Sequence, residues 1–71
     1  MTAREKYERL RDAQSLTDNE VRVRAGIEKA TFYTWRKRQE KTPNATMGVS
    51  HMQRVATALG VTIDAVVGDP E

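Results

Sequence analysis

The chain contains 71 residues and no cysteine. Disulfides, thiolate metal sites and cysteine nucleophiles are therefore excluded, and the stability of the fold must come from packing. Histidine is nearly absent too: His51 is the only one, so a multi-histidine metal site cannot form. His51 lies near the start of a predicted helix, where we expect it to face solvent or to cap the helix.

The acidic side chains are few and scattered. The chain has ten of them, spread mostly over predicted helix surfaces. A domain of this size has no cleft large enough to bury a pair of carboxylates. We therefore expect no enzyme activity, no metal, no cofactor and no small-molecule ligand.

Long apolar runs are also missing. No run approaches the roughly 18 residues that span a membrane, and the charged stretch MTAREKYERLR lacks the apolar centre of a signal peptide. Hydrophobic residues make up 38% of the chain and charged residues 31%, an ordinary balance for a soluble globular domain. We expect a folded cytoplasmic protein that does not bind membranes, and either a complete chain or one domain of a longer one.

Aromatic residues are scarce, and three of the four fall within positions 32–35. The same region carries most of the positive charge. Residues 22–41 hold seven basic side chains and two acidic ones, although the whole chain has a net charge of only +2. Such a segment is a candidate binding site for a polyanion. Runs of charge are also common on helix surfaces that only face water, so composition alone leaves both readings open.

Apolar residues recur at helical spacing near the N-terminus. In AREKYERLRDAQ, Ala3, Tyr7 and Leu10 fall on one face of a helix, with charged residues between them. No segment alternates apolar and polar residues as a half-buried strand does, apart from VRVR at 21–24, which lies inside the next predicted helix. The sequence therefore predicts an all-α fold.

A capping box marks the start of a second helix. Thr17 can accept a hydrogen bond from the amide of Glu20, whose carboxylate can reach back to the amide of Thr17. We therefore expect the helix to begin at Asp18. Gly26 follows the apolar positions of this segment and is expected to end the helix in the left-handed conformation.

The second half of the chain predicts three more helices. Glycine and proline are absent from 28–42, so a third helix is expected over about 28–41. KTPNATMGV is typical of a loop, and SHMQRVATALG predicts a fourth helix that ends at Gly60.

A short fifth helix is expected in TIDAVVG, with Thr62 as its cap and Gly68 as its terminator. Ile63, Val66 and Val67 would be its buried residues. We thus predict one compact five-helix domain over residues 1–68, followed by a frayed tail at 69–71.

The predicted helices supply one apolar core. Its expected members, several of them at helical spacing or at a helix end, are Leu10, Val21, Ala25, Gly26, Ile27, Phe32, Trp35, Val55 and Leu59. Within the third helix, helical phase sends Phe32 and Trp35 inward. Lys29, Tyr33 and Arg36 are expected on the opposite side.

Two short helices joined by a tight turn at a glycine, with a basic run on the second, have the sequence outline of a helix-turn-helix. Four pieces carry a closer resemblance: LRDAQSLTDNEV, AGI, ATFYTW and VATALGVTIDAVVG, in that order. From Leu10 to Val67 the chain resembles the Cro/repressor-type (XRE-like, lambda-repressor-like) helix-turn-helix family of phage and bacterial transcription regulators. The resemblance implies a sequence-specific DNA-binding regulator, such as a small phage or prophage repressor, in the bacterial cytoplasm or nucleoid.

The resemblance also implies roles for individual residues. The positions that would face base edges in the major groove are Glu28, Lys29, Ala30, Tyr33 and Thr34. The positions that would lie near phosphates are Asp18, Asn19, Arg36, Lys37, Arg38 and Lys41. Contacts with base edges read the sequence, whereas contacts with phosphates position the protein without reading it.

Three features differ from the usual pattern of the family. Arg22 stands where a small residue is common, so its side chain must extend outward or widen the packing of the two helices. Arg36 follows Trp35 where many members have a glutamate that pairs with an arginine of the first helix; Arg11 is present here without that partner. The segment from Trp35 to the fourth helix is longer than usual, so either the third helix or the loop after it is extended.

The same resemblance implies partners. We expect double-stranded DNA, with an inverted repeat as operator, and weak self-association through the Val61–Val67 region, with Val23 as a second exposed apolar residue. An alternative is a module of the same shape that uses the third helix or the Val61–Val67 surface to hold another protein, such as a repressor or a polymerase subunit. A single-stranded nucleic-acid binder ranks third, below these two readings, because one exposed tyrosine is a poor platform for stacking bases.

Overall fold

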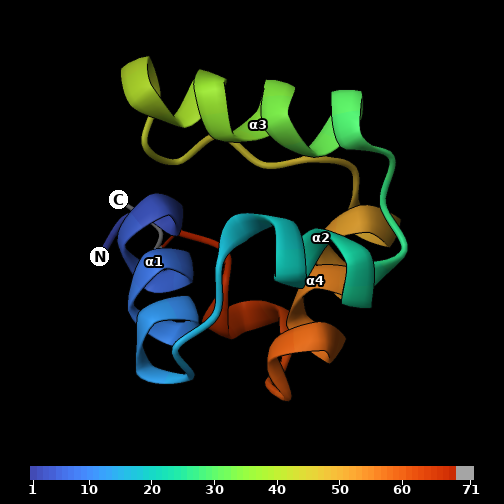
Figure 1. Cartoon of the computed structure of the whole chain (residues 1–71). Helices are drawn as coiled ribbons and strands as arrows, with labels where there is room; N and C mark the ends of the chain where they lie inside the picture. Colours follow the sequence, from blue (N-terminus) through green and yellow to red (C-terminus); the bar gives the residue numbers. More distant parts are fainter. Residues whose placement is uncertain (69–71) are drawn as a thin grey trace.

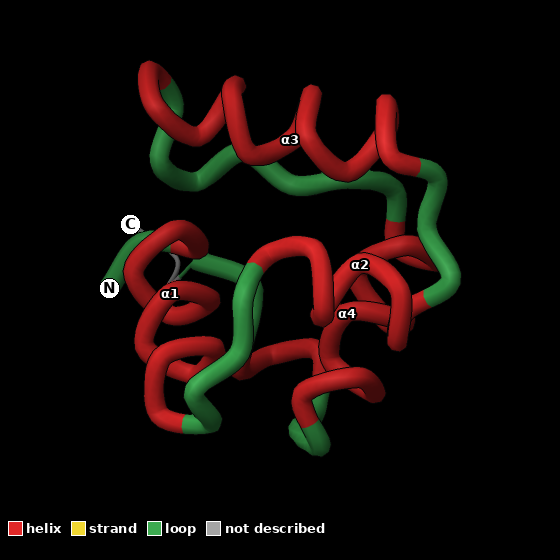
Figure 2. The backbone as a smooth tube through the Cα atoms, in the orientation of Figure 1, coloured by secondary structure: helices red, strands yellow, loops and turns green. Residues whose placement is uncertain are grey.

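The computed structural model describes residues 1–68, and within them it contains helices and no strand. The four α-helices are α1 (Ala3–Ala13), α2 (Asp18–Ala25), α3 (Lys29–Lys41) and α4 (Val49–Leu59), and they are followed by one 3₁₀ turn, η1 (Ile63–Ala65). Figure 2 shows this helical content along the chain. The all-α prediction is confirmed. None of the helices within residues 1–68 has the length and apolar character needed to cross a bilayer.

The predicted fifth helix is not confirmed. Only the three residues of η1 are helical there, and Thr62 precedes them without a side-chain capping bond. Val66 is buried as expected, but Ile63 and Val67 are only partly buried. Val66 anchors the segment to the core, and a full α-helical turn does not form around it. The predicted frayed tail, 69–71, lies outside the described residues.

Local sequence sets the N-terminal starts of α1 and α2. Thr17 accepts from the amide of Glu20 at 3.2 Å, and the Glu20 carboxylate accepts from the amide of Thr17 at 3.2 Å, so the predicted capping box is confirmed. Thr2 and Glu5 form the same arrangement at the start of α1. Each box satisfies two amides that the first turn of a helix leaves without partners.

Two glycines end helices in the left-handed conformation, as predicted for Gly26, and Gly60 ends the fourth helix as predicted. Gly26 has φ 69° after α2 and Gly60 has φ 72° after α4. A side chain at either position would be strained, because L-residues with a Cβ rarely adopt positive φ. The chain can therefore turn sharply from α2 into α3, with only residues 26–28 between the two helices.

Three aromatic rings form the centre of the core. Tyr7 of α1 meets Trp35 of α3 edge-to-face at 5.1 Å between ring centroids, and Phe32 meets Trp35 in the same way at 5.4 Å. All three rings are essentially fully buried. Edge-to-face pairs add to the stability gained by burying the ring area itself. Two of the three clustered aromatics are therefore core residues, as predicted.

Most of the predicted core residues are buried. Those confirmed are Val21, Ala25, Ile27, Phe32, Trp35, Val55 and Leu59. Leu10 is only partly buried but packs against the cluster, and Gly26 is exposed because it sits at a turn. The core also includes Tyr7, Met52, Ala56 and Val66.

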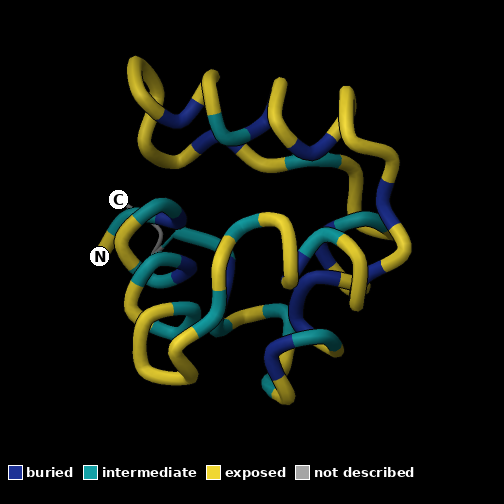
Figure 3. Tube along the Cα trace, in the orientation of Figure 1, coloured by how far each residue is buried: buried dark blue, intermediate teal, exposed yellow. Residues whose placement is uncertain are grey.

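In space, α1, α2 and α4 form one group, and α3 lies across one side of it (Figure 1). Figure 3 shows that the buried residues of α3 face this group and that its opposite side is exposed along its length. α2 and α4 pack against each other. α3 therefore packs against the rest of the domain through one side only.

The segment that follows α3 is attached to α1. The carbonyl of Pro43 accepts from the amide of Arg4 at 2.9 Å, and Asn44 Oδ1 accepts from the amide of Ala3 at 3.0 Å. These bonds satisfy two amides in the first turn of α1 that have no partner within the helix. A Cβ at Gly68 would overlap Asn44 Oδ1, so a glycine is needed beside this contact.

The same segment is also attached to α3. The carbonyl of Ala45 accepts from Trp35 Nε1 at 2.8 Å and from Gln39 Nε2 at 3.1 Å. Gln39 is buried, and both ends of its amide have partners. α3 extends to Lys41, and residues 42–48, called the return segment below, are held against the domain by these bonds. The longer connection noted in the sequence therefore contains both a long helix and a fixed loop.

Candidate nucleic-acid interface

The exposed side of α3 is the most basic helical surface of the described residues. Three residues of the helix, Phe32, Trp35 and Gln39, are buried, and they attach it to the domain. Lys29, Lys37, Arg38 and Lys41 are all exposed, and the only acidic residue within α3 is Glu40. Below, "the α3 face" means the exposed residues of this helix, Lys29, Ala30, Thr31, Tyr33, Thr34, Lys37, Arg38, Glu40 and Lys41.

The residues predicted to face base edges all lie at the surface. Glu28, Lys29, Ala30, Tyr33 and Thr34 are exposed, and they occupy the N-terminal part of α3. Glu28 is the N-cap residue, and its side chain makes no capping bond. Tyr33 is 37% exposed, and its ring lies edge-on to Phe32 at 5.6 Å, so its lower half is packed while its outer part reaches the surface.

Arg36 is the exception among the basic residues of α3. Its side chain is only 14% exposed. Its guanidinium donates to Glu8 Oε2 at 2.6 Å, to Asp18 Oδ2 at 3.2 Å and to Gln39 Oε1 at 2.6 Å, and it lies 4.7 Å from the centroid of the Tyr7 ring. Two carboxylates thus draw Arg36 inward, where it joins α1, α2 and α3. This corrects the expectation that Arg36 points outward and contacts phosphate.

Asp18 belongs to the same cluster and is likewise corrected. Its Oδ1 accepts from Tyr7 Oη at 2.7 Å and from Arg11 Nη1 at 2.8 Å. Burial alone would raise the pKa of Asp18, but the hydrogen bonds from Tyr7 and Arg11 and the charge of Arg36 outweigh it and hold this pKa below its usual value. An ionised carboxylate has no proton to donate to a phosphate, and the Asp18 oxygens already accept from three side chains. The geometry therefore does not support the expected phosphate contact of Asp18.

This cluster also shows how Arg11 is paired. No glutamate follows Trp35, and Arg11 pairs with Asp18 and Asp12. Arg36 in turn pairs with Glu8 of α1. The ionic connection between α1 and α3 therefore exists with its charges exchanged between the two helices.

Asn19 and Arg22 form a second polar group at the start of α2. Arg22 donates to Asn19 Oδ1 from Nε at 3.3 Å and from Nη2 at 2.9 Å, and to the carbonyl of Ile27 from Nη1 at 3.3 Å. Arg22 is half-buried and Asn19 is exposed. The side chain of Arg22 therefore lies along the turn between α2 and α3, and extends outward as its size required.

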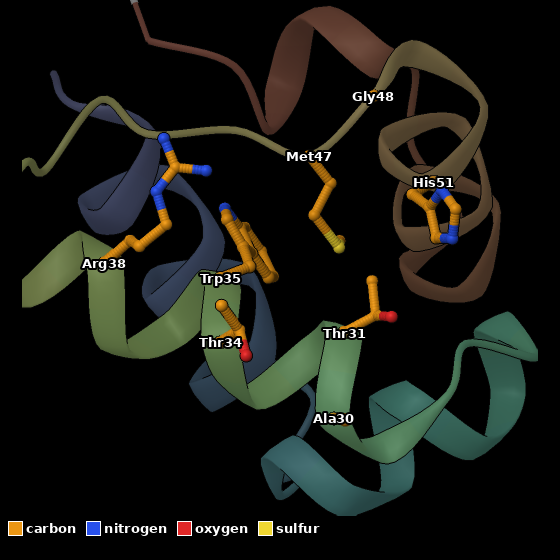
Figure 4. Close-up of a pocket in the computed structure, with 8 residues that line it drawn as sticks. All are labelled: Ala30, Thr31, Thr34, Trp35, Arg38, Met47, Gly48 and His51. Atoms are coloured by element: carbon orange, nitrogen blue, oxygen red, sulfur yellow. The ribbon is translucent and has the colours of Figure 1, made fainter.

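An open hollow of about 450 Å³ lies beside the α3 face. Figure 4 shows its lining: Ala30, Thr31, Thr34, Trp35 and Arg38 come from α3, and Met47, Gly48 and His51 come from the return segment and the first turn of α4. Arg38 stands at one end and His51 at the other, with Trp35 and Met47 between them. The hollow therefore has the Arg38 guanidinium, the His51 ring and two threonine hydroxyls at its edge and an apolar floor.

Three residues near the α3 face were not predicted from the sequence as site residues. Thr31 and His51 line the hollow, and Arg54 donates to the carbonyl of Gly26 at 3.4 Å at the turn before α3. Thr31 lies three positions before Thr34 and seven before Arg38, so helical phase offered a signal for it. His51 and Arg54 are far along the chain, and only the packing of α4 brings them here.

The region expected to support self-association is packed against the core and is only partly exposed. Val66 is buried, and Val61, Ile63 and Val67 pack against the core cluster while remaining partly exposed. The most exposed apolar side chains are instead Val49 at 76% and Val23 at 61%. Val23 was expected to point outward, and it does.

Within residues 1–68, no group of three or more histidine or acidic side chains has the arrangement of a metal site. No protein-family model, no curated protein and no solved structure matches this chain. What the protein does must therefore be inferred from its own sequence and from the geometry of α3 and its surroundings.

Proposed function

We propose that this domain binds double-stranded DNA sequence-specifically, with α2 and α3 acting as a helix-turn-helix and α3 entering the major groove. The observation that carries the proposal is the division of α3 into two sides. Phe32 and Trp35 anchor one side in the core, and the opposite side is exposed, with four cationic side chains. A helix anchored in this way and basic on its free side suits the groove of a polyanion.

The dimensions of α3 agree with this role. Its 13 residues give a length of about 20 Å, at roughly 1.5 Å per residue. The major groove is about 12 Å wide and admits one α-helix. Since the other side of α3 is covered by the domain along its length, the helix can enter the groove while the domain stays folded behind it.

Two groups of residues divide the work in this proposal. Lys29, Ala30, Tyr33 and Thr34, with Glu28 before them, meet base edges: Lys29 suits guanine O6 and N7, Thr34 either edge, and Ala30 a thymine methyl group. Lys37, Arg38, Lys41 and Asn19 meet phosphates. Arg36 and Asp18 take no part in DNA contact, because they neutralise each other inside the domain.

The biological role that we propose is regulation of transcription, as a small repressor that binds an inverted-repeat operator. This rests on the resemblance to Cro/repressor-type regulators in four ordered sequence pieces. Because Val66 is buried and the other apolar residues of the Val61–Val67 region are only partly exposed, we expect self-association to be weak in solution and to be completed on the operator, one protomer per half-site.

Three substitutions test the division of roles. Lys29→Ala and Thr34→Ala should change which operator is preferred, because each removes a base contact that contributes roughly 1–3 kcal/mol of discrimination. Arg38→Ala should weaken binding to all duplexes alike and lower the salt slope by about 1, because it removes one phosphate contact. Affinities for a panel of duplexes at several salt concentrations give both quantities. Uniform loss in all three variants would refute the base-reading assignment.

One observation favours a second candidate. Val23 and Val49 are exposed apolar side chains, and a partner protein that covers them would gain from their burial. Such a module would bind DNA weakly and without sequence preference, and would bind its protein partner with little dependence on salt. The duplex panel separates the two candidates, because only the first predicts a preferred sequence.

A further inference from the structure

The side chain of Arg22 connects two parts of the turn that leads into α3. Three of its N–H groups are used: two donate to Asn19 Oδ1 and one donates to the carbonyl of Ile27. Ile27 is buried and directly precedes the N-cap residue of α3. Arg22 thus attaches an exposed side chain in the first turn of α2 to the backbone at the entry of α3.

This contact fixes the orientation of the Asn19 amide. An arginine side chain only donates hydrogen bonds, so the oxygen of the Asn19 amide must face it. The NH₂ group of Asn19 must then point away from Arg22, with two donors. Without Arg22 the amide can rotate and present its oxygen, which an anion repels.

The position of this amide suits a phosphate. Asn19 is exposed and lies in the first turn of α2, where the helix dipole favours anions. The two carboxylates of this turn are already engaged, Asp18 by Arg11 and Arg36 and Glu20 by Thr17. Asp18, its neighbour, lines a second open hollow together with Tyr33 and Lys37. The first turn of α2 therefore lies beside the α3 face, within the surface that a bound duplex would cover.

We propose that Arg22 is a positioning residue for DNA binding: it holds the Asn19 amide with its NH₂ group directed at a phosphate of the duplex backbone. It contacts no phosphate itself, because its guanidinium is turned toward Asn19 and Ile27. This inference rests on the proposed DNA-binding function. It gives a role to an arginine that occupies a position where a small side chain would pack more simply.

A double-mutant cycle on the preferred duplex tests the inference. Asn19→Ala removes a hydrogen bond to a charged group, which should weaken binding about tenfold. Arg22→Ala should weaken binding by a smaller factor, about two- to fivefold, because the freed amide must be ordered again when it binds the phosphate. The double variant should bind about tenfold more weakly than the unaltered protein, as Asn19→Ala alone does, because without the amide Arg22 has nothing to position.

Two further variants separate positioning from charge. Arg22→Lys keeps the positive charge and loses the planar fork that holds the amide, so it should bind as weakly as Arg22→Ala. Arg24→Ala is the matched control: it removes the same charge from an exposed arginine two positions further along α2, and should reduce affinity less. The salt slope of the Arg22 variants should equal that of the unaltered protein.

The opposite results overturn the inference. Additive losses in the cycle, a salt slope lowered by about 1 in Arg22→Ala, or full affinity in Arg22→Lys would each show that Arg22 binds phosphate directly or acts alone. Circular dichroism confirms which variants are folded, and Arg22→Lys decides the matter if Arg22→Ala unfolds. If the unaltered protein prefers no duplex, the proposed function fails and the inference fails with it; additive losses on a preferred duplex overturn the inference alone.

Discussion

Trp35 combines apolar burial with a specific hydrogen bond. It is 1% exposed, its ring packs edge-to-face against Tyr7 and Phe32, and its Nε1 donates to the carbonyl of Ala45. The residue therefore attaches α3 to α1 and to the return segment at the same time. Domains of about 71 residues have a small free energy of unfolding, so one such side chain contributes a large share of it.

Replacing Trp35 tests this share. Trp35→Ala should lower the free energy of unfolding by roughly 3–5 kcal/mol, enough to unfold most of the protein. Trp35→Phe should lower it less, because it keeps most of the apolar volume and because Gln39 still donates to Ala45. Urea unfolding followed by circular dichroism measures both values. Lys37→Ala, an exposed change on the same helix, is the control and should stay within about 0.5 kcal/mol. A loss below about 1 kcal/mol in Trp35→Ala would contradict the account of the core.

At the scale of the elements, one ionic cluster joins three helices. Glu8 and Arg11 come from α1, Asp18 from α2 and Arg36 from α3. Burial alone would raise the pKa of Glu8, but its bonds to Arg36 and Arg4 outweigh this and lower the pKa, as those of Tyr7 and Arg11 do for Asp18. Each carboxylate is therefore more acidic in the folded protein than in the unfolded chain.

The cluster predicts how stability depends on pH. Carboxylates with lowered folded pKa values stabilise the fold fully above their unfolded pKa values of about 4, and this stabilisation is lost as the pH falls through the folded values. The free energy of unfolding should accordingly decrease as the pH falls from about 5 to 2. Arg36→Met should cost about 1–2 kcal/mol at neutral pH and should make this decrease shallower.

Unfolding of the protein and of Arg36→Met at several pH values gives the comparison. Lys37→Met changes the adjacent exposed residue and serves as the control, with the pH dependence unaltered. An equally steep decrease in Arg36→Met and in the unaltered protein would contradict the role of this cluster.

Local chemistry was enough to predict the ends of α2 and α4. The Thr17 and Glu20 box acts within four residues, and Gly26 and Gly60 follow from the conformation that a helix end requires. The prediction of a fifth helix was not confirmed: only a 3₁₀ turn forms there, and the segment is fixed by the burial of Val66 in the core.

The roles of Arg36 and Gln39 were not predictable in the same way. The partner of Arg36 in α1 is 28 positions away, and the partner of Gln39 depends on the path of the return segment. Helical phase gives the side of a helix on which a residue lies, but not whether a long side chain bends back toward a carboxylate. Of the predicted site, Lys29, Ala30, Tyr33 and Thr34 lie exposed on α3. Asp18 and Arg36 lie beside Tyr33 and Lys37, but their side chains are bonded to each other and to α1.

For the whole molecule, the separation of charge is the central feature. The chain has a net charge of only +2, yet the exposed side of α3 carries four cations while the basic Arg36 and Arg11 are paired internally. Under the proposed function, Coulomb attraction of this kind would give binding to any duplex, and that binding would weaken with salt. A preference among sequences would then come from Lys29 and the uncharged residues of the α3 face.

The most direct test of the proposed function is selection from a pool of random duplexes, with sequencing of the bound fraction at about 150 mM salt, where non-specific contacts are partly suppressed. The account predicts one enriched motif arranged as an inverted repeat, and loss of that enrichment when Thr34→Ala protein is used. Folded protein that enriches no motif would contradict base reading by α3.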